Sequence, residues 1–217
     1  MGDQSTLQSY EQRIFNRLAE SDLYKTYQNA FRNATGLPLR LVGVDEQWCL
    51  PEHLENQSPF CEKLNLCDSA SQACVAINRK LMDDAKAKGP SSCSCFSGMS
   101  ATAVPITLGS NPVAFLKTGQ VFQRTPDEND FNGVLKTLTE SGFLPDDVNT
   151  LKEAYFQTRT VSPERYQSMV TLLSSFGEQL SRHADDLATA QDGREPEAIA
   201  KARKFIHAHL GEALPLP

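Results

Sequence analysis

Residues 93–122 read CSCFSGMSATAVPITLGSNPVAFLKTGQVF, and this stretch predicts two strands joined by a tight turn. Residues 103–108 are apolar and largely β-branched, residues 109–112 (Gly-Ser-Asn-Pro) interrupt them, and residues 113–121 resume the apolar pattern. Thiols, an aromatic residue and a glycine lead into this hairpin. Such a combination is more typical of a small-molecule pocket than of a polymer-binding face.

The bulk properties of the chain indicate an ordinary globular protein. Its 217 residues suffice for one or two domains with a full core. A formal charge of −6 and a pI near 5.3 argue against this chain binding nucleic-acid phosphates by itself. The first residues, MGDQSTLQSYEQR, have no apolar core of the kind found in signal peptides, and no later run approaches the roughly 18 apolar residues of a membrane helix. We therefore expect a cytoplasmic protein without membrane contact.

Helical periodicity and breaking residues surround the hairpin. The predicted helices cover residues 7–18, 22–34, 127–141 and 146–157, with a short one beginning at Ser58-Pro59 and another running from a capping box at Ser69 to Gly89-Pro90. The predicted antiparallel sheet comprises residues 37–44, 92–96, 102–108 and 113–121. The expected fold is α/β (α+β), with this sheet flanked by helices.

The longest predicted helix begins at Ser162-Pro163-Glu164 and carries a heptad seam. Small or apolar residues recur at alternating spacings of four and three: Tyr166, Val170, Leu173, Gly177, Leu180, Ala184 and Leu187. This seam can pack on its own domain or pair with a second copy. We favour the homodimer, because Gly177 and Ala184 permit close approach.

All six cysteines fall between positions 49 and 95: Cys49, Cys61, Cys67, Cys74, Cys93 and Cys95. In a cytoplasmic protein they are thiols, ligands or redox groups rather than structural disulfides. Their spacing is not that of a zinc ribbon. Three interpretations stay open: thiols that line a buried cavity, a metal or iron–sulfur centre held by Cys61, Cys67, Cys74 and Cys95, and a redox pair that includes Cys67.

Catalytic motifs are missing from the sequence. It contains no G-x-S-x-G, no P-loop and no G-x-G-x-x-G, and its four histidines are scattered. We therefore predict that the protein is not an enzyme and requires no cofactor, although a cysteine-bound metal is kept as the alternative.

The segment from about residue 31 to 122 resembles the PocR-type sensory domain of bacterial AraC-family regulators. The resemblance is carried by Thr35-Gly36 before LRLVGVD (residues 39–45), Phe60-Cys61-x-x-Leu64, Cys74 with a downstream Gly89, Cys95-x-x-Gly98, Val104-Pro105-Ile106, the Gly109 turn and Thr118-Gly119-Gln120-Val121. The helices up to about residue 190 fit the same domain. Residues 199–216 look like the first helix of an AraC-type DNA-binding domain, without the recognition helices that should follow.

This resemblance implies a PAS- or GAF-like fold, a small-molecule effector such as a hydrocarbon derivative, and transcriptional control through a helix-turn-helix domain. It divides the chain into a sensory domain at residues 1–190 and, at residues 191–217, a linker with the first helix of a truncated DNA-binding domain. DNA would be a partner only through the missing part. The expected ligand-binding residues are Trp48, Phe60, Cys61, Cys74, Cys95, Phe96, Met99, Thr118 and Gln120. The long helix would relay the signal as a change in dimer geometry.

Overall fold

A computed structural model describes residues 3–44, 55–64, 68–140, 142, 147–191 and 205–206, and only the backbone at residues 3–9, 68–73 and 190–191. In these ranges the elements are α1 (Asp3–Glu20), α2 (Asp22–Thr35), β1 (Leu39–Gly43), α3 (Pro59–Leu64), α4 (Asp68–Lys88), β2 (Ser91–Ser94), β3 (Ser100–Leu108), β4 (Asn111–Val121), α5 (Glu128–Glu140), α6 (Val148–Gln157) and α7 (Pro163–Gln191). Within the described ranges, no helix is long and apolar enough to cross a bilayer. The expected α+β fold is confirmed, and the predicted element boundaries lie within a few residues of those observed.

The four strands form one antiparallel sheet in the order β1-β4-β3-β2. The hairpin expected within residues 93–122 is the β3–β4 pair, and Leu108 lies opposite Asn111 across its turn. β1 adds to the free edge of β4, and β2 adds to that of β3. The chain is therefore organised around β4 and β3, the two longest strands, at the centre of the sheet.

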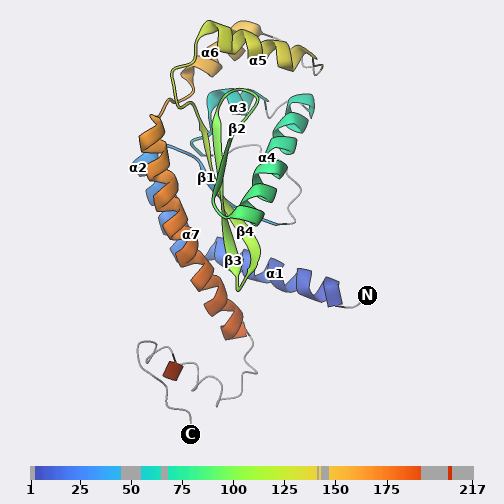
Figure 1. The fold of residues 1–217 in the computed structure, drawn as a ribbon, viewed down its shortest axis with the longest axis vertical. Coiled ribbons are helices and arrows are strands. Elements are labelled where there is room, and N and C mark those ends of the chain that lie inside the picture. The colour runs from blue at the N-terminus through green and yellow to red at the C-terminus, as the bar shows by residue number, and fades with distance from the viewer. Residues whose placement is uncertain are drawn as a thin grey trace.

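Helices cover the two faces of this sheet, as Figure 1 shows, with α7 on one side and α4 on the other. Because successive strand residues point to opposite faces, β3 sends Val104 and Ile106 into the cluster beneath α7, whereas Ala103 packs beneath α4. The α1 and α2 helices join the α7 side. A third cluster lies at one end of the sheet, where α3, α5 and α6 meet around Tyr155.

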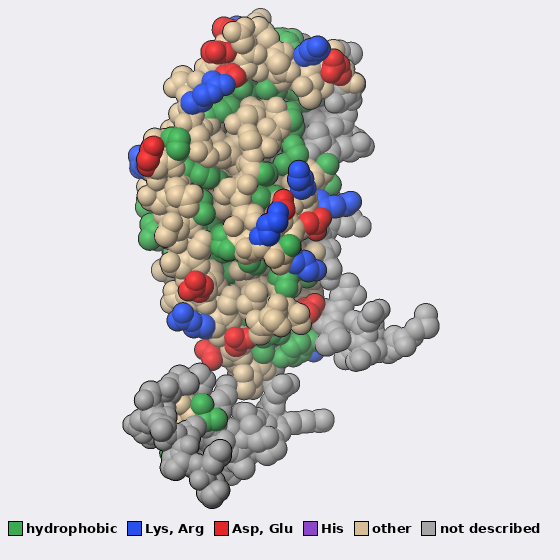
Figure 2. Space-filling view, in the orientation of Figure 1, with side chains coloured by type: hydrophobic (Ala, Val, Ile, Leu, Met, Phe, Trp, Pro, Cys, Tyr) green, Lys and Arg blue, Asp and Glu red, His purple; other side chains and the backbone are tan. Residues whose placement is uncertain are grey.

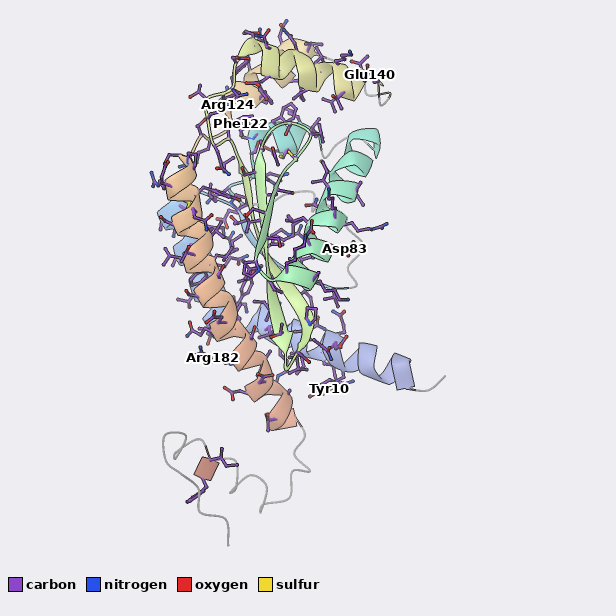
Figure 3. All side chains as sticks on the ribbon, in the orientation of Figure 1. Tyr10, Asp83, Phe122, Arg124, Glu140 and Arg182 are labelled. Carbon is purple, nitrogen blue, oxygen red and sulfur yellow. The ribbon has the colours of Figure 1, made fainter. Side chains whose placement is uncertain are left out.

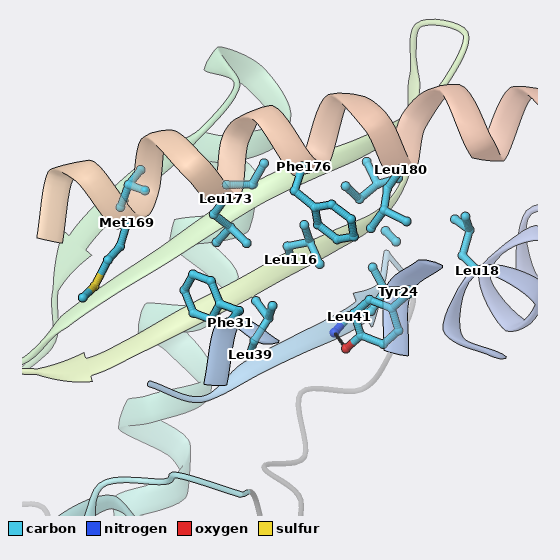
Figure 4. Packing of buried hydrophobic residues seen from close by; sticks show 14 of the residues in the cluster. Leu18, Tyr24, Phe31, Leu39, Leu41, Leu116, Met169, Leu173, Phe176 and Leu180 are labelled. Carbon is cyan, nitrogen blue, oxygen red and sulfur yellow. Dashed lines mark hydrogen bonds between the residues drawn. The ribbon is translucent and has the colours of Figure 1, made fainter. Parts of the chain in front are cut away.

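The heptad seam of α7 packs on the sheet of its own chain. Side chains of α7 extend toward β1, β4 and α2, and Figure 4 labels Met169, Leu173, Phe176, Leu180, Leu39, Leu116 and Phe31. A Cβ atom at Gly177 would lie 2.6 Å from Val104 Cγ1, so this glycine permits close approach to β3. The assignment of the seam to a dimer interface is thus wrong, because its core residues are already buried within one chain.

Residues next to α2 in the sequence determine where this helix begins and ends. Ser21 caps α2 by accepting a hydrogen bond from the Tyr24 backbone N–H, and Gly36 ends it in the left-handed conformation. The Tyr24 hydroxyl then accepts a hydrogen bond from the Leu41 N–H at 2.8 Å, drawn as a dashed line in Figure 4. This contact fixes α2 to β1 and completes the apolar layer beneath α7.

The surface view in Figure 2 shows basic and acidic side chains interspersed on the visible face rather than gathered by sign. This distribution differs from the continuous basic stripe of a nucleic-acid-binding face. The predicted division at residue 191 falls at the edge of the described ranges. Residues 192–204 and 207–217 lie outside them, so the domain assignment stays a prediction.

Candidate ligand cavity

A cavity of about 90 Å³ lies between the sheet and the helices α3 and α4. Its wall is built from three strands, two helices and the turn between β2 and β3. The lining residues are Pro38, Arg40, Cys61, Cys74, Ile77, Asn78, Cys95, Met99, Ser100, Ala101, Lys117, Thr118 and Gln120. A mostly apolar wall with a few polar groups is typical of small-molecule sites.

A β-bulge at the end of β4 shapes one corner of the cavity. The β3–β4 register shifts between Ser100 and Ala101, which leaves Gln120 as the extra residue, with a φ of +60°. Gly119, at φ +131°, has no room for a side chain, because a Cβ atom would collide with the Ser100 carbonyl and lie 2.7 Å from the Ala101 Cα. The bulge therefore requires glycine at 119 and redirects Gln120.

Gln120 connects this bulge to the start of α3. Its Oε1 accepts a hydrogen bond from the Ser58 backbone N–H at 2.9 Å, and the Ser58 hydroxyl is hydrogen-bonded to that of Thr158 at 2.8 Å. Thr118 lies two residues earlier on β4 and donates its hydroxyl proton to the Pro38 carbonyl at 2.7 Å. These bonds hold β1, β4 and α3 around the cavity.

A tight turn places two sulfur-bearing side chains on the wall. The Met99 carbonyl accepts a hydrogen bond from the Cys95 N–H at 2.8 Å, and Gly98 in the turn has a φ of +81°. The Cys95 sulfur lies 2.9 Å from the Ser97 hydroxyl, and the Cys61 thiol contacts the Met99 sulfur at 4.0 Å. The turn between β2 and β3 thus places Met99 against Cys61 of α3.

Two of the cavity thiols, Cys61 and Cys74, are held in their neutral form. Burial raises the pKa of Cys61 well above its ordinary value, and it raises the pKa of Cys74 to about 11. The neighbouring Cys95 acts in the same direction on both. Neutral thiols are poor nucleophiles, and without a bound metal these two side chains pack as small apolar groups.

Two basic side chains on neighbouring strands complete the wall. Arg40 of β1 lies directly opposite Lys117 of β4 in the antiparallel register. Lys117 Nζ donates a hydrogen bond to Asn78 Oδ1 of α4 at 2.7 Å. Burial, and then the Arg40 charge, lower the pKa of Lys117 to about 8. Arg40, Asn78 and Lys117 were not predicted as wall residues, although a lone basic residue within an apolar strand was a signal for Arg40 and Lys117.

The structure brings six of the sequence-predicted ligand residues together in this wall: Cys61, Cys74, Cys95, Met99, Thr118 and Gln120. It does not bring Phe60 and Phe96 there. Phe60 is fully buried against Tyr155, edge to face at 5.1 Å between ring centroids. Trp48 lies outside the described residues, as do Cys49 and Cys67. Ligand contact by any of these residues stays a prediction.

Phe96 lines a second and wider hollow, of about 590 Å³, near α5 and α6. Phe122 and Arg124 mark its position in Figure 3, at the end of β4. An ion pair between Arg124 and Asp130 lies on its rim. Its wall is more polar and more open to solvent than that of the first cavity. We therefore take the smaller, more apolar cavity as the candidate site.

The proposed cysteine ligand set is only partly described. Cys61, Cys74, Cys93 and Cys95 are free thiols. In the described ranges, no three His, Cys, Asp or Glu side chains are grouped so as to hold a metal ion. Because Cys67 falls outside those ranges, the metal alternative stays a prediction.

Comparison with known proteins gave one match. A family model described as the sensory domain found in PocR matches residues 17–185, which is more than half of the chain. No curated protein and no solved structure matched the sequence. The matched range begins in α1 and ends in α7, so it contains the sheet and every described residue of the cavity wall.

Proposed function

The chain belongs to the family of sensory domains found in PocR, and we propose that it binds a small-molecule effector in the cavity between the sheet, α3 and α4. The observation that carries this proposal is the wall itself, where an apolar surface of thiols, Met99 and Ile77 surrounds a few fixed polar groups. Membership of a sensory family also favours signalling over catalysis. So do the raised pKa values of the Cys61 and Cys74 thiols, because neutral thiols are poor nucleophiles.

Binding would be relayed through the sheet to α7. Ala101 lines the cavity, and the next residue, Thr102, points to the opposite face, where its hydroxyl is hydrogen-bonded to that of Tyr166 at 2.8 Å. Farther along α7, Ser181 Oγ accepts a hydrogen bond from the Thr107 N–H and an Asp185 carboxylate oxygen accepts one from the Gly109 N–H. A shift of β3 at the cavity is therefore transmitted directly to α7.

A second connection leads from the bulge to the start of α7. Phe122, two residues after Gln120, exchanges backbone hydrogen bonds with Arg159 and Val161 at 2.9 and 2.8 Å. Val161 lies two residues before α7 begins at Pro163. Movement of Gln120 by a ligand would thus reach the first turn of the same helix.

The output of this relay, in our proposal, is transcriptional control by a helix-turn-helix domain of a homodimeric AraC-family regulator. Support comes from the resemblance of residues 199–216 to the first helix of such DNA-binding domains, and from α7, which leads toward that segment. Because the heptad seam is buried within the chain, a dimer would need another surface. Sedimentation of the full chain, with and without a bound effector, measures the oligomeric state.

The binding proposal is tested by filling the cavity. A thermal-shift screen with small alcohols, diols, aldehydes and carboxylates should find compounds that raise the melting temperature, because a ligand of the native state stabilises it. Ala101→Leu should abolish those shifts, since Ala101 lines the wall, whereas Ala101→Ser keeps the space open and serves as the matched control. Compounds that stabilise the Leu and Ser variants equally would place binding elsewhere.

The metal and redox alternative has its own test. A native mass spectrum of anaerobically purified protein should show no zinc or iron–sulfur mass that depends on Cys61, Cys74 and Cys95. A metal mass lost on replacement of those cysteines by serine would make them ligands and would replace the effector proposal.

A further inference from the structure

Two amide side chains line the cavity, Asn78 from α4 and Gln120 from the bulge of β4. Asn78 Oδ1 accepts a hydrogen bond from the Lys117 ammonium at 2.7 Å, and Gln120 Oε1 accepts one from the Ser58 backbone N–H at 2.9 Å. An ammonium and a backbone N–H can only donate, so these two bonds fix which end of each amide is the oxygen. The opposite end of each amide is therefore an NH₂ group that can only donate.

These two NH₂ groups are available to a ligand. Within the described ranges, neither the Asn78 nor the Gln120 nitrogen has a hydrogen-bond partner. The buried side-chain nitrogen and oxygen atoms without a partner in those ranges are Arg32 Nε and Gln57 Oε1. The two amide nitrogens are thus accessible, and the cavity presents hydrogen-bond donors from two of its sides.

The oxygen atoms of the wall are used by the protein itself. Besides the two amide oxygens, Ser100 Oγ accepts a hydrogen bond from Gln123 Nε2 at 2.7 Å. Thr118 is almost fully buried and directs its hydroxyl to the Pro38 carbonyl. Sulfur is a weak acceptor, so the thiols and Met99 do not replace these oxygens. A ligand hydroxyl would find donors for its oxygen but no strong acceptor for its proton, whereas a carbonyl oxygen needs donors alone.

We propose that the effector is a small carbonyl compound, whose oxygen accepts hydrogen bonds from the amide N–H groups of Asn78 and Gln120 and whose short carbon chain packs against Met99 and Ile77. This inference rests on the proposed function, since it names the chemical class that the same cavity binds. A dry cavity of about 150 Å³ accommodates benzene, so a volume of about 90 Å³ favours a smaller molecule.

Butanone and butan-2-ol provide a matched pair of probes. They share a four-carbon skeleton and differ in carrying a carbonyl or a hydroxyl oxygen at the second carbon. The chain contains four methionines. Methyl-labelled methionine therefore gives a reporter inside the cavity at Met99 and buried controls outside its wall at Met82 and Met169. In a titration of the full chain, butan-2-ol should need about tenfold higher concentration than butanone to shift the Met99 signal, because its proton stays unpaired.

Acidic isosteres of the two amides test the role of their N–H groups. Asn78→Asp keeps the oxygen that Lys117 binds, Gln120→Glu keeps the oxygen that Ser58 binds, and each replaces an NH₂ donor by an acceptor. The two changes together should weaken butanone binding by about tenfold or more and leave butan-2-ol binding equal or tighter. Each single variant should move the preference in the same direction. Asn132→Asp, on the exposed face of α5, adds the same charge elsewhere and should change neither affinity.

The outcomes separate this inference from the function on which it rests. Equal or tighter binding of butan-2-ol by the wild type, or a wild-type preference kept by the single and combined variants, would overturn the carbonyl assignment and leave effector binding in place. Tighter binding of propionate than of butanone would overturn it too, because charge would then select the ligand. A Met99 signal that does not respond to butanone, while other members of the screen still stabilise the protein, would do the same. The proposed function itself fails if no compound of the screen binds in the cavity.

Discussion

Replacement of Leu173 by Ala should destabilise the protein strongly, whereas the same change at the adjacent Leu172 should not. Leu173 is 0% exposed inside the cluster beneath α7, and Leu172 is 65% exposed on the outer face. A fully buried Leu→Ala change costs about 3–5 kcal/mol in transfer free energy and cavity formation, whereas a surface change stays within about 0.5 kcal/mol. The pair holds helix position, residue type and propensity almost constant, so burial alone distinguishes the two variants.

Urea unfolding followed by circular dichroism measures the difference. With a slope of about 2–3 kcal/mol per molar urea, the midpoint of Leu173→Ala should fall by about 1–2.5 M, and that of Leu172→Ala by less than about 0.3 M. Both variants should keep the oligomeric state of the wild type. If Leu173→Ala instead kept wild-type stability but converted a dimer to a monomer, the seam would be an interface between copies and our account of α7 would be refuted.

Three further predictions follow from the cavity wall. Gly119→Ala should lower the free energy of unfolding by about 2–6 kcal/mol, because a Cβ atom there adds both backbone strain and overpacking. Gly109→Ala, at the open hairpin turn, should lower it by only about 1–2 kcal/mol, from backbone strain alone. Equal losses for the two variants in urea unfolding would mean that the collision at Gly119 is relieved by movement of its neighbours. The pKa of Lys117 is about 8 in the folded chain and 10.5 in the unfolded one, so the unfolded state binds more protons between these values. Wild-type stability should therefore rise relative to Lys117→Met from pH 8 toward pH 10.5, by up to about 1.4 kcal/mol per pH unit, and a flat difference would contradict the lowered pKa. Because the pKa of Cys74 is raised to about 11, its alkylation at pH 8 should be about 100-fold slower in the folded chain than in urea, as measured by mass spectrometry. Comparable rates in the two states would favour the interpretation of the cysteines as reactive redox groups.

Local signals in the sequence were sufficient for most of the fold. The predicted helix over residues 22–34 is α2, bounded by the caps Ser21 and Gly36, and the apolar runs around Gly109 are β3 and β4. Such features depend on residues close together in the chain, where backbone sterics and hydrogen bonding decide the conformation. The heptad seam was harder, because a regular apolar stripe looks the same whether it covers a sheet or a second helix.

The full set of residues in the cavity wall could not be predicted from local sequence signals. Arg40 and Lys117 are far apart in the chain, and only the β1–β4 register makes them neighbours. Motifs in the sequence predicted the thiols and Gln120 that line the cavity, whereas Phe60 and Phe96, predicted with them, are not among its lining residues. Aromatic side chains are large enough to form a hydrophobic cluster of their own. Phe60 belongs to such a cluster, in which it packs against Tyr155 of the distant α6.

The most direct test of the central claim is a methyl NMR titration of the full chain with compounds that stabilise it in the thermal screen. We predict that the Met99 signal shifts and saturates with each such compound, that the Met82 signal moves far less, and that Ala101→Leu removes the Met99 response. A Met99 signal that stays fixed while a stabilising compound binds would contradict the assignment of this cavity as the effector site.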